Sequence, residues 1–240
     1  MRDENEERKE LNIAIDVWGD LACFTNPMCK VERLSYPIMT PSVARNILCS
    51  IYYKPPEFYY EIVKIEIMNP IDYINVKKNE VKEKIKYKNQ QIYMKPDPDN
   101  PSNRERGRTP RNTCYLKNVY YRIHAKIIKR DDWDGKIESL YAQFKRRVEK
   151  GQCFRQPYLG LRECVCHFSM PNENKVPNQN INLIVAPLLY DVFDITNNVK
   201  LNEKNAKDVI KISFFDAKVI HGVCKIPPFN SNKIRRVKNV

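Results

Sequence analysis

Three neighbouring residues of the sequence carry atoms that bind metals. Cys164, Cys166 and His167 offer the sulfur and nitrogen ligands that zinc prefers, within four positions of one another. Side chains on an extended chain alternate between two faces, so both cysteines would point away from His167. The eight cysteines of the chain contain no Cys-x-x-Cys pair. We therefore expect free thiols, no metal ion and no cofactor, with a zinc site as the weaker alternative.

A second group of chemically active side chains alternates along one predicted strand. Arg122, His124 and Lys126 occupy every other position, which puts them on one charged face. Histidine is the side chain whose ordinary pKa lies nearest neutrality, so His124 could transfer protons to a bound substrate. A surface strand that displays charge to solvent is the simpler interpretation.

The charge balance indicates a polyanionic partner. The 240 residues include 42 Lys and Arg against 29 Asp and Glu, a net charge of +13. Nucleic acid is favoured over a membrane because no basic amphipathic helix with interfacial aromatics is apparent. A basic, solvated surface is the alternative. No apolar stretch is long enough to cross a bilayer and the first ten residues are polar, so we expect a cytoplasmic protein without membrane contact.

Two helices are predicted from the signals at their ends. Thr40 is a good N-cap and Pro41 a good first residue for a helix that ends before Lys54. The second helix is predicted at residues 135–150, with an N-cap in the acidic run 131–134 and a glycine stop after it.

The remaining ordered segments read as strands. These are residues 11–18, 59–68, 71–76, 114–128, 154–170, 181–195 and 209–220. Residues 77–112 are rich in Lys, Asn, Arg and Pro and predict a mobile basic insertion, either a binding element or a linker. This order predicts an α+β fold, a ferredoxin-like βαββαβ domain at 1–176 and a small antiparallel β-sheet domain at 177–240.

Four strings of the sequence carry a family resemblance. They are GDLACFT at 19–25, KVERLSYPIMTPS at 30–42, SIYYKP at 50–55 and KGQCFRQPYLGLRE at 150–163. In this order they resemble the "d" variant of the CRISPR-associated Cas-five family of subtype I-C, within the RAMP superfamily. The resemblance covers most of residues 11–170 and is thin beyond about residue 170.

The resemblance implies a fold and a role. Members of the family have a ferredoxin-like, RNA-recognition-type domain followed by a small β domain. They cut the repeat hairpins of CRISPR precursor RNA without a metal ion and then stay with the guide. The implied partners are precursor RNA, the mature guide RNA, target DNA, and the backbone and large subunits of the surveillance complex.

The resemblance also implies catalytic residues. The family uses a Tyr, a Lys and the His after it, which match Tyr52, Lys136 and the next position, but that position is Ile137 here. A helix N-terminus favours phosphate, which suits Lys136, and a tyrosine donates a proton more readily than it accepts one. A solvated Lys136 and a Tyr52 that closes the first helix are the alternatives. His124 is a third candidate, as a substitute for the missing histidine.

Basic and aromatic residues in or beside the four strings are candidates for RNA binding, because phosphate contacts combine with base stacking in such sites. They are Lys30, Arg33, Arg45, Arg146, Arg147, Lys150, Phe154, Arg155, Tyr158 and Arg162. As alternatives, Arg162 could form an ion pair with Glu163, and the cations near position 147 could complement the end of a helix.

We keep three functional hypotheses. The first is an endoribonuclease that cuts the CRISPR repeat hairpin at the 3′ base of its stem and leaves a 2′,3′-cyclic phosphate; the resemblance alone implies the hairpin and the position of the cut. The second is a non-catalytic subunit that holds the 5′ handle of the guide, which Ile137 favours. The third is a general basic RNA or DNA binder, which strict preference for one hairpin would exclude.

Overall fold

The computed structural model describes residues 9–29, 31–81, 86–88, 91–93, 108–196 and 210–237. Within them lie the helices α1 (Pro41–Ile51) and α2 (Ile137–Glu149). The strands are β1 (Glu10–Ala22), β2 (Arg33–Leu34), β3 (Phe58–Ile67), β4 (Tyr73–Val81), β5 (Lys86–Lys88), β6 (Gln91–Tyr93), β7 (Arg108–Lys129), β8 (His167–Ser169), β9 (Leu183–Phe193), β10 (Ile210–Ile220), β11 (Val223–Lys225) and β12 (Arg235–Arg236).

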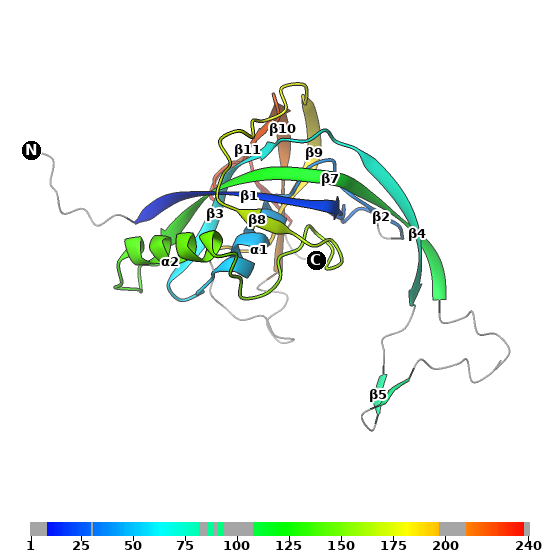
Figure 1. Ribbon diagram of the computed structural model, residues 1–240, viewed down its shortest axis with the longest axis horizontal. Coiled ribbons are helices and arrows are strands. Elements are labelled where there is room, and N and C mark those ends of the chain that lie inside the picture. The colour runs from blue at the N-terminus through cyan, green and yellow to red at the C-terminus, as the bar shows by residue number, and fades with distance from the viewer. Residues whose placement is uncertain are drawn as a thin grey trace, which may run out of the picture.

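One curled, mainly antiparallel sheet of ten strands organises the molecule. Its main path runs β12-β10-β11-β3-β7-β1-β8, with β2 and β4 added to β7 and β9 added to β10. The only parallel pairing among these described strands is that of β2 with β7. The helices lie together on one side of β1, β3 and β7 (Figure 1). The chain is therefore a mixed α/β protein dominated by an antiparallel sheet.

The alternation of side chains along β7 divides the two faces of the sheet. Tyr121, Ile123, Ala125 and Ile127 are buried against the helices, and the residues between them face the other side. On α2 the buried stripe is Ile137, Leu140, Phe144 and Val148. Ile137 thus packs inward, 2% exposed in the main core.

Helix α1 forms as its end signals predict. Thr40 is the N-cap, its hydroxyl accepts a hydrogen bond from the Val43 N–H at 3.3 Å, and Pro41 is the first helical residue. Helix α2 begins later than predicted, at residue 137. Its N-cap is Lys136, which makes no side-chain capping bond, so the expected cap in the acidic run 131–134 is wrong.

Several strand predictions need correction. The first strand continues past residue 18 to Ala22, because it stays paired with β7 as far as Leu116. Gly19 does not end the strand. It leaves room for the chain at Val165, whose carbonyl oxygen would lie 2.5 Å from a Cβ atom there. The extended run predicted at 154–170 is mostly loop, in which β8 pairs with β1 and a single bridge joins Tyr158 to Val165. Strand pairing, unlike strand propensity, needs a neighbour at the right distance.

The predicted basic insertion is ordered at both of its ends. Residues 73–81 of β4 pair with residues 108–116 of β7, so the two strands extend together away from the rest of the sheet (Figure 1). Most of the remaining insertion lies outside the described residues. No helix in the described part of the chain is long and apolar enough to span a membrane.

Candidate functional site

The candidate site lies where the C-terminal ends of α1 and α2 meet the loop after α2. Gly151 ends α2 in a left-handed conformation, φ 62°, which glycine adopts at no steric cost. The loop then binds α1: the N–H groups of Phe154 and Arg155 both donate to the Ser50 carbonyl, at 2.8 and 3.2 Å. We call the side chains gathered here the helix-end cluster: Tyr52, Arg147, Lys150, Phe154 and Arg155.

Tyr52 caps α1 and combines a buried ring with an available hydroxyl. Its N–H donates to the Leu48 carbonyl at 3.0 Å, and its ring lies 5.4 Å from that of Phe58. The residue is 6% exposed, its hydroxyl forms no hydrogen bond with the described residues, and it is not one of the fully buried polar atoms that lack a partner. The Tyr52 hydroxyl is therefore free to bond to a ligand.

Burial sets the protonation state of this hydroxyl. Desolvation raises the pKa of Tyr52 above its ordinary value of 10.0, and the positive charges of Lys54 and Arg147 oppose that rise only in part. At neutral pH Tyr52 is thus a proton donor, as the sequence predicts for a tyrosine without a strong cationic partner.

Arg147 connects the two helix ends. Its guanidinium carbon lies 5.5 Å from the centre of the Tyr52 ring, and Nη1 donates to the Ile51 carbonyl at 3.3 Å. Its Nε is buried without a hydrogen-bond partner within the described chain. The sequence predicted an RNA-binding role for Arg147 but gave no signal of its contact with Tyr52, because the two residues are far apart along the chain.

The outer part of the cluster is cationic and aromatic. Arg155 is held in place by Ser50 Oγ at 3.1 Å and Asn46 Oδ1 at 2.6 Å. Lys150 is exposed, and so is Phe154, at 83%. An exposed ring on the same loop as a cation suits a nucleobase with its phosphate, because stacking and charge act together.

The structure does not place Lys136 in this cluster. Lys136 is exposed at the N-terminus of α2, whereas Arg147, which contacts Tyr52, lies near the other end of the helix. Eleven residues separate them, which is about 16 Å along a helix axis. Within the described chain, no hydrogen bond joins Lys136 to Tyr52. The N-cap position still faces free backbone N–H groups, which favour phosphate.

His124 lies on the opposite face of the sheet. Its Nε2 is 3.2 Å from Glu66 Oε1, although the pair is not aligned as a hydrogen bond. Burial lowers the pKa of His124 below its ordinary 6.5, and the Glu66 carboxylate opposes this only in part. Because Tyr52 packs on the helix side, His124 and Tyr52 cannot act on the same phosphate.

The charged side chains around His124 form ion pairs, so this strand does not display free charge to solvent as the simpler interpretation expected. Arg122 binds Asp16 at 2.6 and 3.1 Å, and Lys126 binds Glu10 at 2.7 Å. The partner carboxylates come from β1, which the sequence of β7 alone cannot indicate.

One predicted RNA-binding residue is structural. Arg45 donates two hydrogen bonds to the Asp191 carboxylate, at 2.7 and 2.8 Å, and joins α1 to β9 in the interior. Asp191 also accepts bonds from the N–H groups of Val192 and Phe193. The prediction that Arg45 contacts RNA conflicts with this geometry, because the Asp191 carboxylate occupies one edge of its guanidinium and the side chain is only 18% exposed.

The other candidates are dispersed. Arg33 pairs with Glu80 at the start of β2, and Arg146 donates to Gln143 at 3.0 Å. Arg162 is exposed, but Glu163 binds Lys78 and Tyr115, so the alternative of an Arg162–Glu163 pair is wrong. Tyr158 is half-buried in a bridge to Val165. Lys30 lies outside the described residues.

The cysteine and histidine run behaves as its alternation predicts. Cys164 and Cys166 are buried, and burial raises the pKa of the Cys164 thiol to about 11. His167 is exposed and stacks on Trp18 at 5.9 Å. Among the described residues, no group of three His, Cys, Asp or Glu side chains could hold a metal ion.

The curled antiparallel sheet and its two helices define a fold class that solved structures share. A crystal structure of a CRISPR-associated protein aligns with a TM-score of 0.63 at 19% identity, covering 94% of this chain and 96% of that one. A functionally uncharacterized protein from Streptococcus mutans aligns with a TM-score of 0.61 at 18% identity, covering 96% and 100% of the two chains.

The sequence comparisons give the family. Residues 12–227 match the Cas5d family of CRISPR-associated proteins, and the chain belongs to this family. It is 35% identical to the CRISPR pre-crRNA endoribonuclease Cas5d of Mannheimia succiniciproducens over 228 residues, 93% of this chain and 98% of the relative. It is 36% identical to the protein of the same name from Thermus thermophilus over 180 residues, 75% of this chain and 72% of the relative.

Proposed function

We propose that this protein is a metal-independent endoribonuclease that binds repeat hairpins in CRISPR precursor RNA, cuts at the 3′ base of the stem and keeps the guide. The helix-end cluster carries the proposal: a free Tyr52 hydroxyl beside the Arg147 cation, with the exposed Phe154 on the loop that hydrogen-bonds to α1. Family membership and the names of both relatives support the substrate.

The reaction needs no group beyond the protein and the RNA. The 2′-oxygen of the RNA attacks phosphorus and loses its proton to a base, while the bond from phosphorus to the 5′-oxygen breaks and that oxygen takes a proton. The products are a 2′,3′-cyclic phosphate and a 5′-hydroxyl. Tyr52 is suited to give the second proton because its pKa is raised, and the cations stabilise the charge that develops on phosphorus.

Lys136 and His124 have different roles in this proposal. Lys136 can hold a phosphate at the N-terminus of α2, and an RNA strand that reached both ends of the helix would contact it and Tyr52 together. His124 is the weakest candidate, since its side chain lies on the other face of the sheet.

A second candidate function is a guide-holding subunit that binds the 5′ handle without cutting. It is supported by Ile137, which stands where the family has a proton-transferring histidine and is sealed in the core. A positioned acid or base is typically worth about 10² to 10⁴ in rate, so its absence weakens catalysis.

The finer fold assignment belongs to the same proposal. The neighbours β8-β1-β7-β3 are all antiparallel, with α1 after β1 and α2 after β7, and this supports a ferredoxin-like βαββαβ core. We place it in residues 1–176 and the small β-sheet domain in 177–240. We further propose that the protein acts in the cytoplasm with the backbone and large subunits of the subtype I-C complex, and beside target DNA.

The test is incubation of the purified protein with a labelled cognate repeat RNA in excess EDTA. We expect one cut, which a deoxy sugar at the cleavage position prevents and which Tyr52→Phe slows without loss of hairpin binding. Tight binding by the wild type without any cut would instead establish the guide-holding function. Weak binding to every RNA would contradict both.

A further inference from the structure

Three lysines stand side by side across neighbouring strands at the C-terminal part of the sheet. Lys225 on β11 is paired directly with Lys64 on β3. The β10–β11 hairpin pairs Val219 with Cys224, so one position further along Lys218 lies opposite Lys225. We call Lys64, Lys218 and Lys225 the lysine row.

The lysine row lies on the face of the sheet away from the helices. The neighbours of its members, Ile65, Cys224 and Val219, are buried in the main core, so the lysines between them point outward. Directly opposite side chains in a sheet have Cβ atoms about 5 Å apart, and like charges at that distance destabilise the fold. Repulsion between the lysines therefore lowers the stability of the fold, and a bound anion would relieve it.

The positive charges of the row are mostly uncompensated. Lys64 binds Glu66 at 2.6 Å, but in the described residues neither Lys218 nor Lys225 has an ion pair or a side-chain hydrogen bond. The carboxylate of Asp216, nearby on β10, accepts two hydrogen bonds from Arg235, at 2.5 and 3.1 Å.

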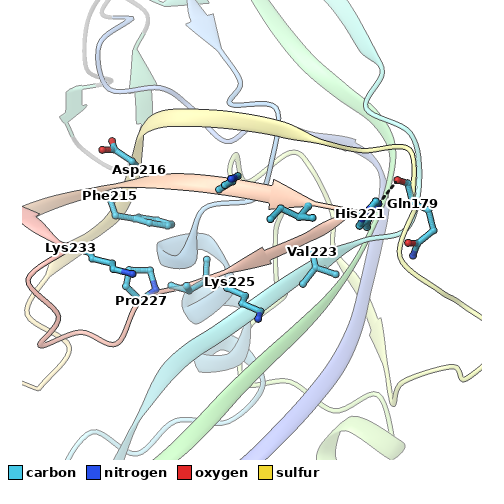
Figure 2. Close-up of a pocket in the computed structure, with 11 residues that line it drawn as sticks. Gln179, Phe215, Asp216, His221, Val223, Lys225, Pro227 and Lys233 are labelled. Atoms are coloured by element: carbon cyan, nitrogen blue, oxygen red, sulfur yellow. Dashed lines mark hydrogen bonds between the residues drawn. The ribbon is translucent and has the colours of Figure 1, made fainter.

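A pocket of about 780 Å³ adjoins the row. Lys218, Lys225 and Lys233 line it together with apolar side chains that include Ile220, Val223 and Pro227. Figure 2 shows Lys233 directed toward Pro227. Asp216, whose carboxylate is bound by Arg235, is the one acidic residue among the described residues of the lining. The pocket therefore offers an apolar surface rimmed by cations, large enough for a base or a sugar.

The direction of the row restricts its ligand. The row runs across the strands. Because β11 and β3 each pair with a strand on both sides, neither has a free backbone edge to which a peptide strand could add. A chain with a negative charge at every unit matches cations repeated from strand to strand. The phosphodiester backbone of single-stranded nucleic acid has that property, and lysines bind phosphates as point charges.

We propose that the lysine row and its pocket form a second binding site, for the phosphodiester backbone of single-stranded RNA or DNA, on the sheet face opposite the helix-end cluster. The site does not depend on cleavage activity. An RNA cut or held at the helix ends is one ligand for it, and a separate single strand is another.

The test compares a double variant with a matched control by fluorescence anisotropy on labelled oligouridylate and oligothymidylate. The variant is Lys218→Gln with Lys225→Gln. The control, Lys145→Gln with Lys211→Gln, removes two half-exposed lysines that each lie 3.8 Å from a carboxylate. Loss of two phosphate contacts should reduce the slope of log affinity against log salt by about 1.4 for single strands, and the control should keep the wild-type slope.

Further readouts separate the possible outcomes. The double variant should unfold at the same or a higher temperature than the wild type, because a like-charge contact is relieved, and it should still cut the repeat hairpin at the wild-type rate under saturation. Equal slopes for variant and wild type, or equal losses in the control, would overturn the site. So would displacement of oligouridylate by polyglutamate at matched charge, which would indicate an acidic protein ligand.

The two oligonucleotides distinguish RNA from DNA as the source of the phosphates. If the wild-type protein never cuts the hairpin, the nuclease proposal fails. The anisotropy result still shows whether the lysine row binds single-stranded nucleic acid.

Discussion

At the scale of single residues, the contact between Arg147 and Tyr52 is the feature on which the proposed chemistry most depends. A guanidinium over a tyrosine ring fixes the ring and adds positive charge near its hydroxyl. We therefore propose that Arg147 positions Tyr52, at the opposite end of α2 from Ile137, which stands where the family has its histidine. Its neighbour Arg146 has the same charge but points to Gln143 on the helix surface.

We predict that Arg147→Met lowers the single-turnover cleavage rate by about 10²-fold, the usual effect of removing one charge-stabilising group. Arg146→Met serves as the matched control and should change hairpin affinity as much but leave the rate unchanged. Arg147→Lys should restore part of the rate, because the charge returns without the planar contact. Equal rates for the two methionine variants would show that Arg147 only binds RNA.

At the scale of elements, the start of α2 combines a weak cap with a candidate phosphate site. Lys136 occupies the N-cap position without a side-chain capping bond. Serine at this position would accept a hydrogen bond from the helix backbone, and a good N-cap stabilises a helix by about 1 kcal/mol.

We predict that Lys136→Ser raises the free energy of unfolding by about 1 kcal/mol and lowers the cleavage rate. Denaturant unfolding and single-turnover cleavage measure the two effects on one sample. A rise in stability together with slower cleavage can only come from lost function, because damage to the fold would lower both. Unchanged cleavage would make Lys136 a solvated lysine, as its exposure allows.

At the scale of the whole molecule, the sheet face away from the helices is held by pairs of opposite charges between strands. Burial alone would raise the pKa of Glu66, but the hydrogen bond from Lys64 and the nearby His124 lower it below 4.5 overall. A carboxyl group with a lowered pKa stabilises the fold above its ordinary pKa, and that stabilisation is lost as the pH falls through the lowered value. His124 acts in the same direction, because its lowered pKa disfavours the protonated form in the fold.

We predict that the wild type is more stable than Glu66→Gln at neutral pH and that the difference shrinks as the pH falls below about 4.5. Urea unfolding at several pH values measures the difference. Glu149→Gln, an exposed change on α2, is the control and should differ from the wild type less than Glu66→Gln does at neutral pH. A difference for Glu66→Gln that is independent of pH would contradict the proposed role of the carboxylate.

The sequence by itself determined the local features of the protein. Thr40 and Pro41 specify the start of α1 because capping depends on neighbouring residues alone, and the spacing of apolar residues specifies which face of α2 is buried. The four strings specify the family. In the C-terminal part, residues 183–193 and 210–220 form strands close to where alternation predicts them.

Only the tertiary structure decided which charges are free and which side chains meet. The sequence alone indicates a surface cation at Arg45. In the folded protein Arg45 forms an ion pair with Asp191, which is distant along the chain. The lysine row exists only because β11 lies between β10 and β3, and Arg147 contacts Tyr52 only because the two helix ends meet. Contacts between distant segments depend on the register and packing of the whole sheet, which no local pattern records.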